Sequence, residues 1–471
     1  MYLRSRWWHP VGMRDPYASL RETIDGDLLT AEHAGYDEAR RMWNGVHDLR
    51  PGVIVRPRSS GGVATALRFA REHDLELAIR SGGHSPAGHS CTDGGLVIDL
   101  AGMRGVTVDP ATRIARVNGG ALLGELDVAA QAHGLVCPTG VVGHTGVAGL
   151  TLGGGVGRLQ RRFGLTIDSL RAVELVTADG RHVRASATEE PGLFWGLRGA
   201  GWNFGIATAF EFELHPFGPH LNRGVRVYPA RAAREAWEVF SDYAAMAPDT
   251  VSMIYGIAPP DGSEDGTRRD RWDPIVVVSF NHSGLADDVE RDTAGLRRGP
   301  EPLSVSGGPM AYLEAQTAHD LLLGFGHRTF IAGLYGNDLP LATLDALVER
   351  VAVGPAGGSF SITAQGGAIA RVDDHATAFT GRSARFDYSA DATWDDAAED
   401  ERNRAWARDS MALVEPLAIE GRYANENADY GPEQTRLLYG DAKLARLAAL
   451  KRVWDPDNVF QRNHNVGPAE H

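Results

Sequence analysis

Arg80-Ser-Gly-Gly-His84-Ser-Pro-Ala-Gly-His-Ser90 lies between two strand-like runs, Leu75 to Arg80 and Leu96 to Leu100. Glycines that follow a strand let backbone N–H groups turn toward an anion, because no Cβ atom stands in the way. The pattern therefore points to a nucleotide cofactor, with His84 at its centre. Since most glycine-rich loops are plain turns, this interpretation needs further support.

A second glycine cluster supplies that support. The segment from Gly140 to Gly157 packs eight glycines and few charges into eighteen residues. Because each glycine costs about 1 kcal/mol relative to alanine inside a helix, the segment is not expected to form an ordinary helix. A tightly packed bend in the core is the alternative interpretation. Two such clusters about sixty residues apart favour a shared ligand.

Four motifs carry a resemblance to a known family. They are Arg80-Ser-Gly-Gly-His84-Ser, the run Gly146-Val-Ala-Gly-Leu-Thr-Leu-Gly-Gly-Gly155, the stretch Leu193 to Ile206, and Trp454-Asp-Pro-Asp-Asn-Val-Phe460 followed by Asn463-His-Asn465. In this order and spacing they resemble the berberine bridge enzyme-like branch of the FAD-linked oxidases (the vanillyl-alcohol oxidase superfamily), and bacterial members in particular. The resemblance covers nearly the whole chain. It implies that His84 carries FAD covalently on the 8α-methyl carbon.

The resemblance also implies the fold class. We expect an α+β protein with a two-part PCMH-type FAD-binding domain, and a substrate domain made of an antiparallel sheet backed by helices. The Pro/Gly-rich break His215-Pro-Phe-Gly-Pro219 marks the first boundary. The expected segments are 1–217 for the first part of the FAD-binding domain, 218–422 for the substrate domain, and 423–471 for the return to the FAD-binding domain.

Local patterns predict individual elements. A helix is expected over Pro57 to Glu72, with Ser60 as its N-cap. Strands are expected around Val106–Val108, Ile114–Val117, Ala172–Thr177, Ala207–Leu214 and Ile275–Phe280, and further helices over Ala230–Ala244, Leu341–Val351 and Asp441–Val453.

By the same resemblance, FAD contacts are expected along both glycine clusters and the tail. Besides the covalent His84 they are Ser81, Gly82, Gly83, Ser85, His89, Ser90, Thr139, Gly140, Gly143, His144, Thr145, Gly149, Gly153, Gly154, Gly157, Ile206 on the adenine side, Tyr423, Asn425, Asn463 and Asn465. His144 has a second interpretation, as the cap of a turn.

Cys137 raises the question of a second covalent bond, since some relatives hold FAD through a cysteine. If Ala132-His-Gly-Leu135 and Gly146-Val-Ala-Gly149 are aligned without gaps, the family's second attachment position falls on Val142. We therefore expect a single bond, at His84. Cys137 is then a small apolar residue lining the flavin loop.

The sequence departs from the resembled family at the position of the catalytic base. Where relatives have Tyr-x-Asn and then an aromatic residue or histidine, this chain has Tyr423-Ala-Asn-Glu426. A carboxylate screened from water has a raised pKa, so Glu426 is a candidate either to accept a substrate proton or to pair with a cationic group. A solvated loop carboxylate is the alternative, and the usual tyrosine base, Tyr423, is in doubt.

Further pocket candidates lie on strands expected over Phe360–Val372 and Arg385–Tyr388. They are Gln365, Arg371 and Tyr388, although strand alternation sends every second side chain outward. Arg158 and Gln160 stand where relatives often place an aromatic residue, which indicates either a polar ligand or a surface salt bridge.

Composition limits the partners. The 471 residues carry a formal charge of −14, which opposes nucleic acid and anionic membrane surfaces. No apolar run approaches the ~20 residues of a membrane span, and Met1 to Pro10 lacks a signal-peptide core. Two cysteines are too few for a disulfide framework or a structural zinc site, so a cytoplasmic protein without metal is expected. The expected assembly is a monomer or a homodimer.

The expected reaction is hydride transfer from a small organic substrate to flavin, with O2 as acceptor and hydrogen peroxide as product. The substrate is predicted to be a secondary metabolite, with oxidation of a carbohydrate alcohol as the alternative. A flavin-binding protein or nonredox flavoenzyme is the alternative from another class. Gly153-Gly-Gly-Val-Gly157 does not complete G-x-G-x-x-G, so a nicotinamide site is unsupported.

Overall fold

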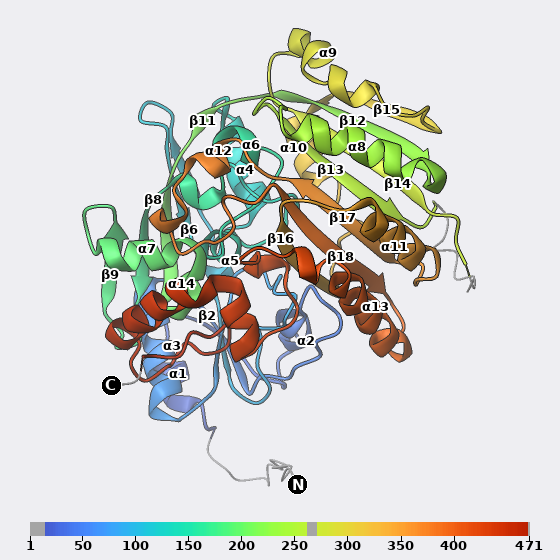
Figure 1. The fold of residues 1–471 in the computed structure, drawn as a ribbon. Helices are drawn as coiled ribbons and strands as arrows, with labels where there is room; N and C mark the ends of the chain where they lie inside the picture. Colours follow the sequence, from blue (N-terminus) through green and yellow to red (C-terminus); the bar gives the residue numbers. More distant parts are fainter. Residues whose placement is uncertain (1–14, 261–270, 470–471) are drawn as a thin grey trace.

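A computed structural model describes residues 15–260 and 271–469, which form an α+β fold (Figure 1). Three sheets and a two-stranded ladder carry the architecture of this part of the chain. The segment Met1 to Pro10, which was expected to lack a signal-peptide core, lies outside the described residues. Within the described ranges, no helix has the length and apolar character that crossing a membrane requires.

The first sheet brings the His84 loop to its strand ends. Its order is β1-β2-β4-β3, with β2, β4 and β3 parallel and β1 antiparallel. The helix α3 crosses between β2 and β3 and begins at Ser60, after the expected Pro57. Its N-cap is Ser59 and not Ser60, because the Ser59 hydroxyl accepts from the N–H of Gly62 at 3.2 Å. The bounds are β1 Gly26–Leu29, β2 Val53–Pro57, α3 Ser60–Glu72, β3 Leu77–Arg80 and β4 Leu96–Asp99.

The second sheet is antiparallel, with order β5-β6-β10-β8-β9. Its strands are β5 Val106–Asp109, β6 Ile114–Asn118, β8 Leu170–Val176, β9 His182–Ser186 and β10 Ile206–Glu213. Phe210 and Phe212 of β10 point into the same large core as Leu126 of α4 (Leu123–Gln131). Beside it, β7 (Leu135–Val136) pairs with β11 (His215–Pro216).

The glycine cluster at 140–157 is not wholly irregular. Residues Val147–Leu152 form the short helix α5, so the expectation that this segment avoids helix is wrong for its centre. Val147, Ala148 and Leu152 face the core there, and burial of these side chains outweighs the cost of the single interior glycine. The glycines before and after α5 remain in loops.

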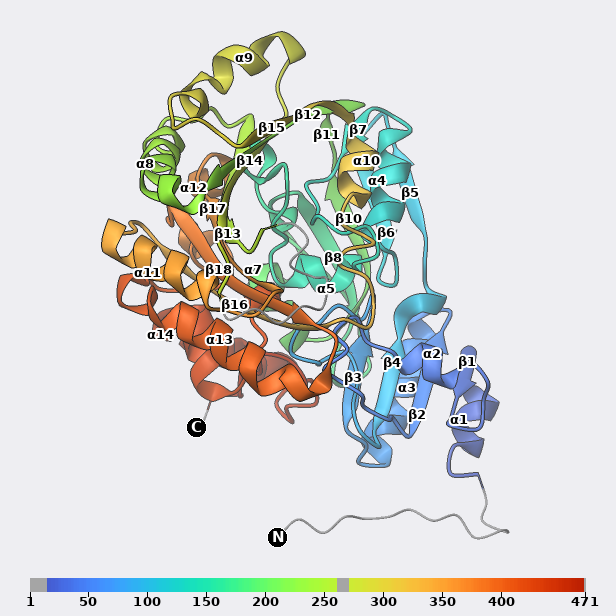
Figure 2. The ribbon, with the colours of Figure 1, turned by 90° about the vertical axis from the view of Figure 1, so that its right-hand side faces the viewer.

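The third sheet has seven antiparallel strands in the order β15-β12-β14-β13-β17-β18-β16. The helices α8, α11 and α13 cover one face, and the other face looks toward the glycine loops (Figure 2). The bounds are β12 His220–Pro229, β13 Val251–Ala258, β14 Ile275–His282, β15 Ser304–Ala311, β16 Arg328–Gly336, β17 Gly358–Ala364, β18 Phe386–Trp394, α8 Ala233–Ala244, α11 Leu341–Ala352 and α13 Asp400–Ala412.

One expected roof strand is shorter than predicted. The strand expected over 360–372 ends at Ala364, because two glycines with positive φ, Gly366 and Gly367, turn the chain into the helix α12. The remaining helices are α1 Ala18–Thr23, α2 Tyr36–Arg40, α6 Gln160–Phe163, α7 Pro191–Ala200, α9 Val289–Asp292, α10 Tyr312–Thr317 and α12 Ala368–Arg371.

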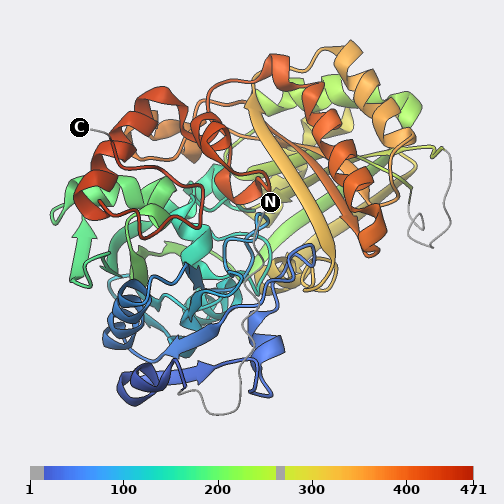
Figure 3. The same ribbon diagram turned by 90° about the horizontal axis from the view of Figure 1, so that it is seen from below.

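The C-terminal segment returns to the first lobe of the molecule. The helix α14 (Pro432–Trp454) lies beside α7, and Leu447 packs into the core of the second sheet (Figures 1 and 3). It starts before the expected Asp441, since the chain is helical on both sides of a kink at Gly440, where φ is +68°. The division of the chain at residues 217 and 422 stays a prediction.

Candidate active site

Both glycine clusters and the C-terminal tail line one groove. The loops touch at their glycines: a Cβ atom on Gly82 would stand 2.2 Å from the backbone nitrogen of Gly146. Only residues without side chains permit this approach. The sequence-predicted residues that line the groove are Ser81, Gly82, Gly83, His84, Ser85, His89, Ser90, Gly140, Thr145, Gly149, Ile206, Tyr423, Asn425 and Asn463.

Other predicted cofactor residues brace the second loop instead of lining the groove. A Cβ atom on Gly157 would meet the carbonyl oxygen of Thr139 at 1.8 Å, and the N–H of Gly143 donates to the Asp320 carboxylate at 2.7 Å. These bracing or neighbouring residues are Thr139, Gly143, His144, Gly153, Gly154, Gly157 and Asn465.

Several buried polar atoms around the groove lack a partner among the described residues. They include Nε2 of His89, Oδ1 of Asn463 and Nδ1 of His464, all on groove-lining residues. Buried polar atoms are normally hydrogen-bonded, so a group of atoms without hydrogen-bond partners fits the binding of a polar ligand. Donors and acceptors set among paired glycines suit the phosphates, ribityl chain and ring edges of FAD.

His84 sits at the end of this groove in an aromatic enclosure. Its ring stacks on Trp43 at 5.2 Å between centroids and meets the edge of Phe325 at 5.5 Å. Burial, together with the neighbouring His144 and Arg80, lowers the pKa of His84 to about 3. The imidazole is therefore neutral at physiological pH, as a nitrogen nucleophile must be.

A chain of hydrogen bonds fixes which His84 nitrogen carries the proton. Nε2 of His144 is 3.2 Å from the backbone oxygen of Asp320, and a carbonyl only accepts, so this nitrogen donates. Nδ1 of neutral His144 is then an acceptor, and Nε2 of His84, at 2.7 Å, donates to it. The lone pair of His84 is left on Nδ1, whose other contact is with the Thr145 hydroxyl at 3.4 Å.

The two candidates for a second bond differ in position. Val142 lines the groove, whereas Cys137 is fully buried in the core. Burial, aided by Asp127, raises the pKa of the Cys137 thiol well above its usual value. A thiol in such surroundings is a poor nucleophile.

Tyr423 and Asn425 tie the C-terminal segment to the second glycine loop. The Tyr423 hydroxyl accepts from the N–H of Val156 at 3.0 Å and from the Asn425 amide at 2.8 Å. Burial and the charge of Glu426 raise the pKa of Tyr423. Tyr423 also lines the groove, and its role as a base stays a prediction.

A second cavity, of about 1030 Å³, lies under the free face of the seven-stranded sheet. Asp387, Ser389 and Asp391 project into it from β18, with Ser361 and Thr363 of β17 beside them. Glu426 lines both this cavity and the groove, so it marks their junction.

The carboxylates at this junction perturb one another. Burial and the charge of Asp391 raise the pKa of Glu426 to about 7. Burial also raises the pKa of Asp391 to about 6, and burial with both neighbours raises that of Asp387 well above its usual value. Like charges in a desolvated site disfavour ionisation, which is how proteins prepare carboxylates for proton transfer.

Three predicted pocket residues are not in the cavity wall. Tyr388 points to the opposite face of β18, where its hydroxyl donates to the backbone oxygen of Asp338 at 2.9 Å. Arg371 ends α12 and pairs with Asp249 near the surface, because the strand assumed there stops earlier. Gln365 is buried beside Arg161, whose guanidinium donates to the backbone carbonyl oxygen of Gln365.

Arg158 and Gln160 are both buried, at 8% and 2% exposure, so the surface salt bridge is wrong for them. Arg158 donates to His319 at 3.3 Å. Nε of Arg158 and Oε1 of Gln160 have no partner among the described residues, and a polar ligand near them stays a prediction.

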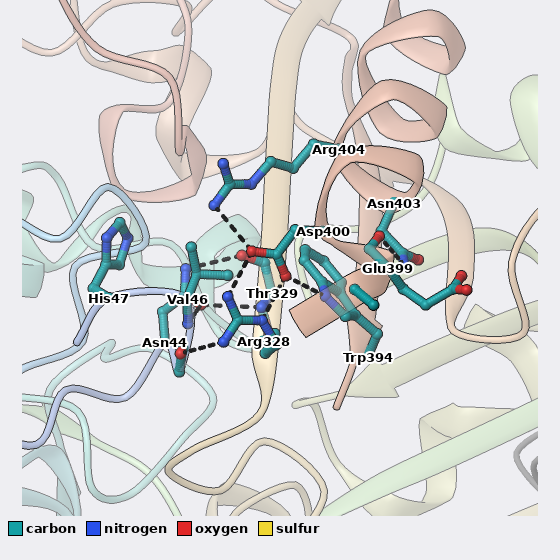
Figure 4. A network of polar contacts seen from close by, with 12 residues as sticks. Asn44, Val46, His47, Arg328, Thr329, Trp394, Glu399, Asp400, Asn403 and Arg404 are labelled. Carbon is teal, nitrogen blue, oxygen red and sulfur yellow. Dashed lines mark hydrogen bonds and ion pairs between the residues drawn. The ribbon is translucent and has the colours of Figure 1, made fainter. Parts of the chain in front are cut away.

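Hydrogen bonds and an ion pair join the segment that follows Trp43 to strand β16 of the sheet, in a clamp of Asn44, Gly45, Arg328, Thr329 and Asp400 (Figure 4). Asn44 exchanges hydrogen bonds with the backbone of Thr329 at 2.8 and 3.0 Å. Arg328 donates to the backbone oxygen of Gly45 at 2.9 Å and pairs with Asp400. Trp43, whose ring stacks on His84, directly precedes Asn44 of this clamp in the sequence.

The sequence interpretation missed Trp43, Asp320, Asp387 and Asp391. For the aspartates a signal was present: in Phe386–Trp394, apolar and polar residues alternate, which assigns Asp387 and Asp391 to the same face. Trp43 and Asp320 reach the site only through long-range packing. Within the described ranges, no group of three or more His, Cys, Asp or Glu side chains is arranged to hold a metal.

Two family models match the chain. A model described as an FAD binding domain matches residues 51–186, and one described as berberine and berberine like matches residues 422–467. Together they cover the His84 loop, the second glycine cluster and the segment that holds Glu426.

Similar proteins extend over almost the full length. (R)-6-hydroxynicotine oxidase of Paenarthrobacter nicotinovorans is 31% identical, over 95% of this chain and 97% of its own. A crystal structure of 6-hydroxy-D-nicotine oxidase from Arthrobacter nicotinovorans matches with a TM-score of 0.82 and 29% identity, covering 95% and 99% of the two chains. A structure of glucooligosaccharide oxidase from Acremonium strictum, whose FAD is described as 6-S-cysteinyl, 8α-N1-histidyl, shares the fold at a TM-score of 0.85 and 23% identity, covering 96% and 99%.

Proposed function

The chain belongs to the berberine bridge enzyme-like family of FAD-linked oxidoreductases, and from this premise we propose that it is an oxidase whose FAD is bonded to His84. A small organic substrate gives up hydride, and O2 takes the electrons and leaves as hydrogen peroxide. The observation that carries the proposal is a neutral imidazole whose Nδ1 carries the lone pair, with only a long contact of 3.4 Å to the Thr145 hydroxyl, at the end of a groove of paired glycines and unpartnered polar atoms.

We place FAD along the groove with its ring system beside His84. When bound, FAD supplies the hydride acceptor and the route to O2, while the protein orients and tunes it. In the proposal, the groove-lining set named above touches FAD, and the bracing set, including Thr139 and Gly157, holds the loop in shape.

His144 and the Asp320 carbonyl act as positioning groups for attachment. They hold the Nε2 proton of His84, so that Nδ1 is the atom that bonds to the 8α carbon. In forming that bond, Nδ1 would replace one hydrogen of the 8α-methyl group. The C–H bond would break, its proton would leave to water, and its electron pair would enter the flavin ring, from which O2 would take it. The Nε2 proton of the alkylated imidazole would pass to His144. One bond is proposed, since Cys137 is buried away from the groove.

Replacing His144 by alanine should slow covalent attachment by about tenfold or more, because the acceptor that fixes the His84 tautomer is lost. The measurement is the fraction of FAD that stays with the denatured polypeptide. His144→Gln, which restores an acceptor, should recover part of the attachment, and the exposed His133→Ala serves as control. Full attachment in His144→Ala would contradict the assignment.

Glu426 is proposed as the base for the substrate. It stands where the groove meets the larger cavity, and a pKa of about 7 suits proton transfer near neutral pH. The family takes varied substrates, so fold alone does not choose among them. A secondary metabolite is proposed, with a carbohydrate alcohol as the second candidate, supported by the likeness to an oligosaccharide oxidase.

Cellular setting and assembly remain part of the proposal. Both cysteines are unpaired and buried, which suits a reducing cytoplasm. We propose a monomer or homodimer whose partners are its substrate and O2.

The proposed activity has a direct test. Under anaerobic conditions a true substrate should bleach the flavin absorbance, and admission of air should restore it with one hydrogen peroxide released per cycle. Bleaching that air does not reverse would identify a dehydrogenase. Bound flavin that no member of an amine, sugar and phenol panel reduces would favour the nonredox alternative.

A further inference from the structure

Three carboxylates meet in the larger cavity without a counter-ion. Asp387, Asp391 and Glu426 form no ion pair with a described residue, although Asp391 is close enough to raise the pKa of Glu426, and both are close enough to raise that of Asp387. A buried charge without a partner costs free energy, and three together cost more. A ligand that supplies positive charge would stabilise the ionised forms of these carboxylates.

Unpartnered polar groups beside the carboxylates point to the same conclusion. The hydroxyl of Tyr335, a residue only 1% exposed, has no hydrogen-bond partner among the described residues. Tyr335 lies directly opposite Asp387 across the β16–β18 pair, and so shares its face of the sheet. Asp387 itself is 5% exposed, lines the cavity, and accepts no hydrogen bond from the described side chains.

From this geometry we infer that the cavity is a cation-recognition site, in which Asp387, Asp391 and Glu426 bind the protonated amine of the substrate. The inference rests on the proposed oxidase function and names its substrate class. A bare metal ion is a poorer occupant, since no described group of these residues has metal-ligand geometry.

The other residues that line the cavity indicate the kind of scaffold that carries the amine. At about 1030 Å³ the cavity is as large as the biggest common ligand pockets, so the substrate is more than a simple alkylamine. Leu321 and Leu322, 94% and 63% exposed, line its mouth, and Trp43 and Trp272 line its wall. These side chains fit an amine carried on a larger, partly apolar scaffold.

Placing the amine at Glu426 gives a balanced reaction. Glu426 takes one N–H proton from the ammonium, and the nitrogen lone pair then forms a C=N bond as the adjacent C–H bond breaks. The C–H electron pair leaves as hydride to the flavin. Hydride, the proton taken by Glu426 and O2 together make hydrogen peroxide, and the organic product is an iminium ion that water can hydrolyse.

The test compares two probes of matched shape in the isolated flavin-containing enzyme: choline, a permanent cation, and its neutral isostere 3,3-dimethyl-1-butanol. Titration calorimetry should show choline binding at least tenfold more tightly. In the double variant Asp387→Asn/Asp391→Asn that preference should disappear. The control Asp409→Asn, an exposed carboxylate on α13 paired with Arg350, should keep it.

A second measurement needs no variant. The charge of choline does not change with pH, so its affinity should fall at least fivefold from pH 8 to pH 5 as Asp391 and Glu426 take up protons. The other ionisable groups facing this cluster are Tyr335 on β16 and Tyr423 beside Glu426. His327, Asp395, Asp396, Glu399 and Arg402 line the cavity farther out.

The outcomes separate this inference from the proposed function. Equal binding of choline and its isostere, or pH-independent binding of choline, would overturn the cation site even if the flavin turns over. Bleaching by a neutral sugar such as cellobiose, with no response to any amine, would do the same. Absence of covalent FAD would refute the proposed function, while the calorimetry would still report on the carboxylates.

Discussion

His84→Ala should yield a polypeptide that is colourless after denaturation and weighs only what its amino acids weigh. The wild type, treated in the same way, should carry the additional mass of one FAD. The expected loss is complete, because Nδ1 of His84 is the proposed nucleophile at the groove and Cys137 is buried away from it. Intact-protein mass spectrometry makes the comparison.

The matched control is His182→Ala, which changes an exposed histidine on β9 and should leave FAD attached. Adding FAD during expression separates failed attachment from failed supply. Covalent FAD persisting in His84→Ala would refute single attachment at this residue and would implicate Cys137.

Glu426→Gln should lower the rate of flavin reduction by about 100-fold, since a positioned general base contributes at least this much. Anaerobic stopped flow measures that half-reaction without interference from O2. In the wild type the rate should rise with pH through about 7, because Glu426 must lose its proton to act. The variant should lose this dependence.

Glu433→Gln is the control for charge and size, as Glu433 is exposed on α14 and paired with Arg436. The neighbouring charge that raises the pKa of Glu426 is Asp391, so the midpoint of the pH profile should drop in Asp391→Asn. If flavin reduction in Glu426→Gln keeps the wild-type rate, Glu426 is not the base.

The fold was largely predictable because its signals are local. Glycine clusters, helix stripes and proline breaks act within a few residues, and they indicated α3, α8, α11 and the second half of α14. Errors arose at element ends, where tertiary contacts decide. The helix α5 forms because its apolar side chains are buried, a fact that glycine content alone does not reveal.

The cofactor groove was more predictable than the substrate cavity. His84 and its glycines are contiguous in sequence, whereas the cavity joins β18 to the segment at Glu426 and to a loop near Leu322. Tyr388 was chosen as a polar residue of β18, but its ring is large enough to belong to the core. Alternation along the strand was the better guide.

Long-range positioning could not be predicted from local pattern. Asp320 holds His144 from 176 residues away, and Asn44 reaches Thr329 across 285. Each contact depends on how two folded segments meet, and nothing in either segment alone specifies its partner.

Alternate residues of the strand β18 have different roles. Phe386, Tyr388 and Ala390 serve the hydrophobic interior, while Asp387, Ser389 and Asp391 face the cavity. Substitutions at the cavity-facing residues can change which substrates are bound without disturbing the packing of the core residues. A combinatorial library randomised at those three codons alone should therefore yield well-expressed enzymes of new selectivity. The same separation of core and cavity residues offers one route by which a single scaffold diversifies over evolutionary time.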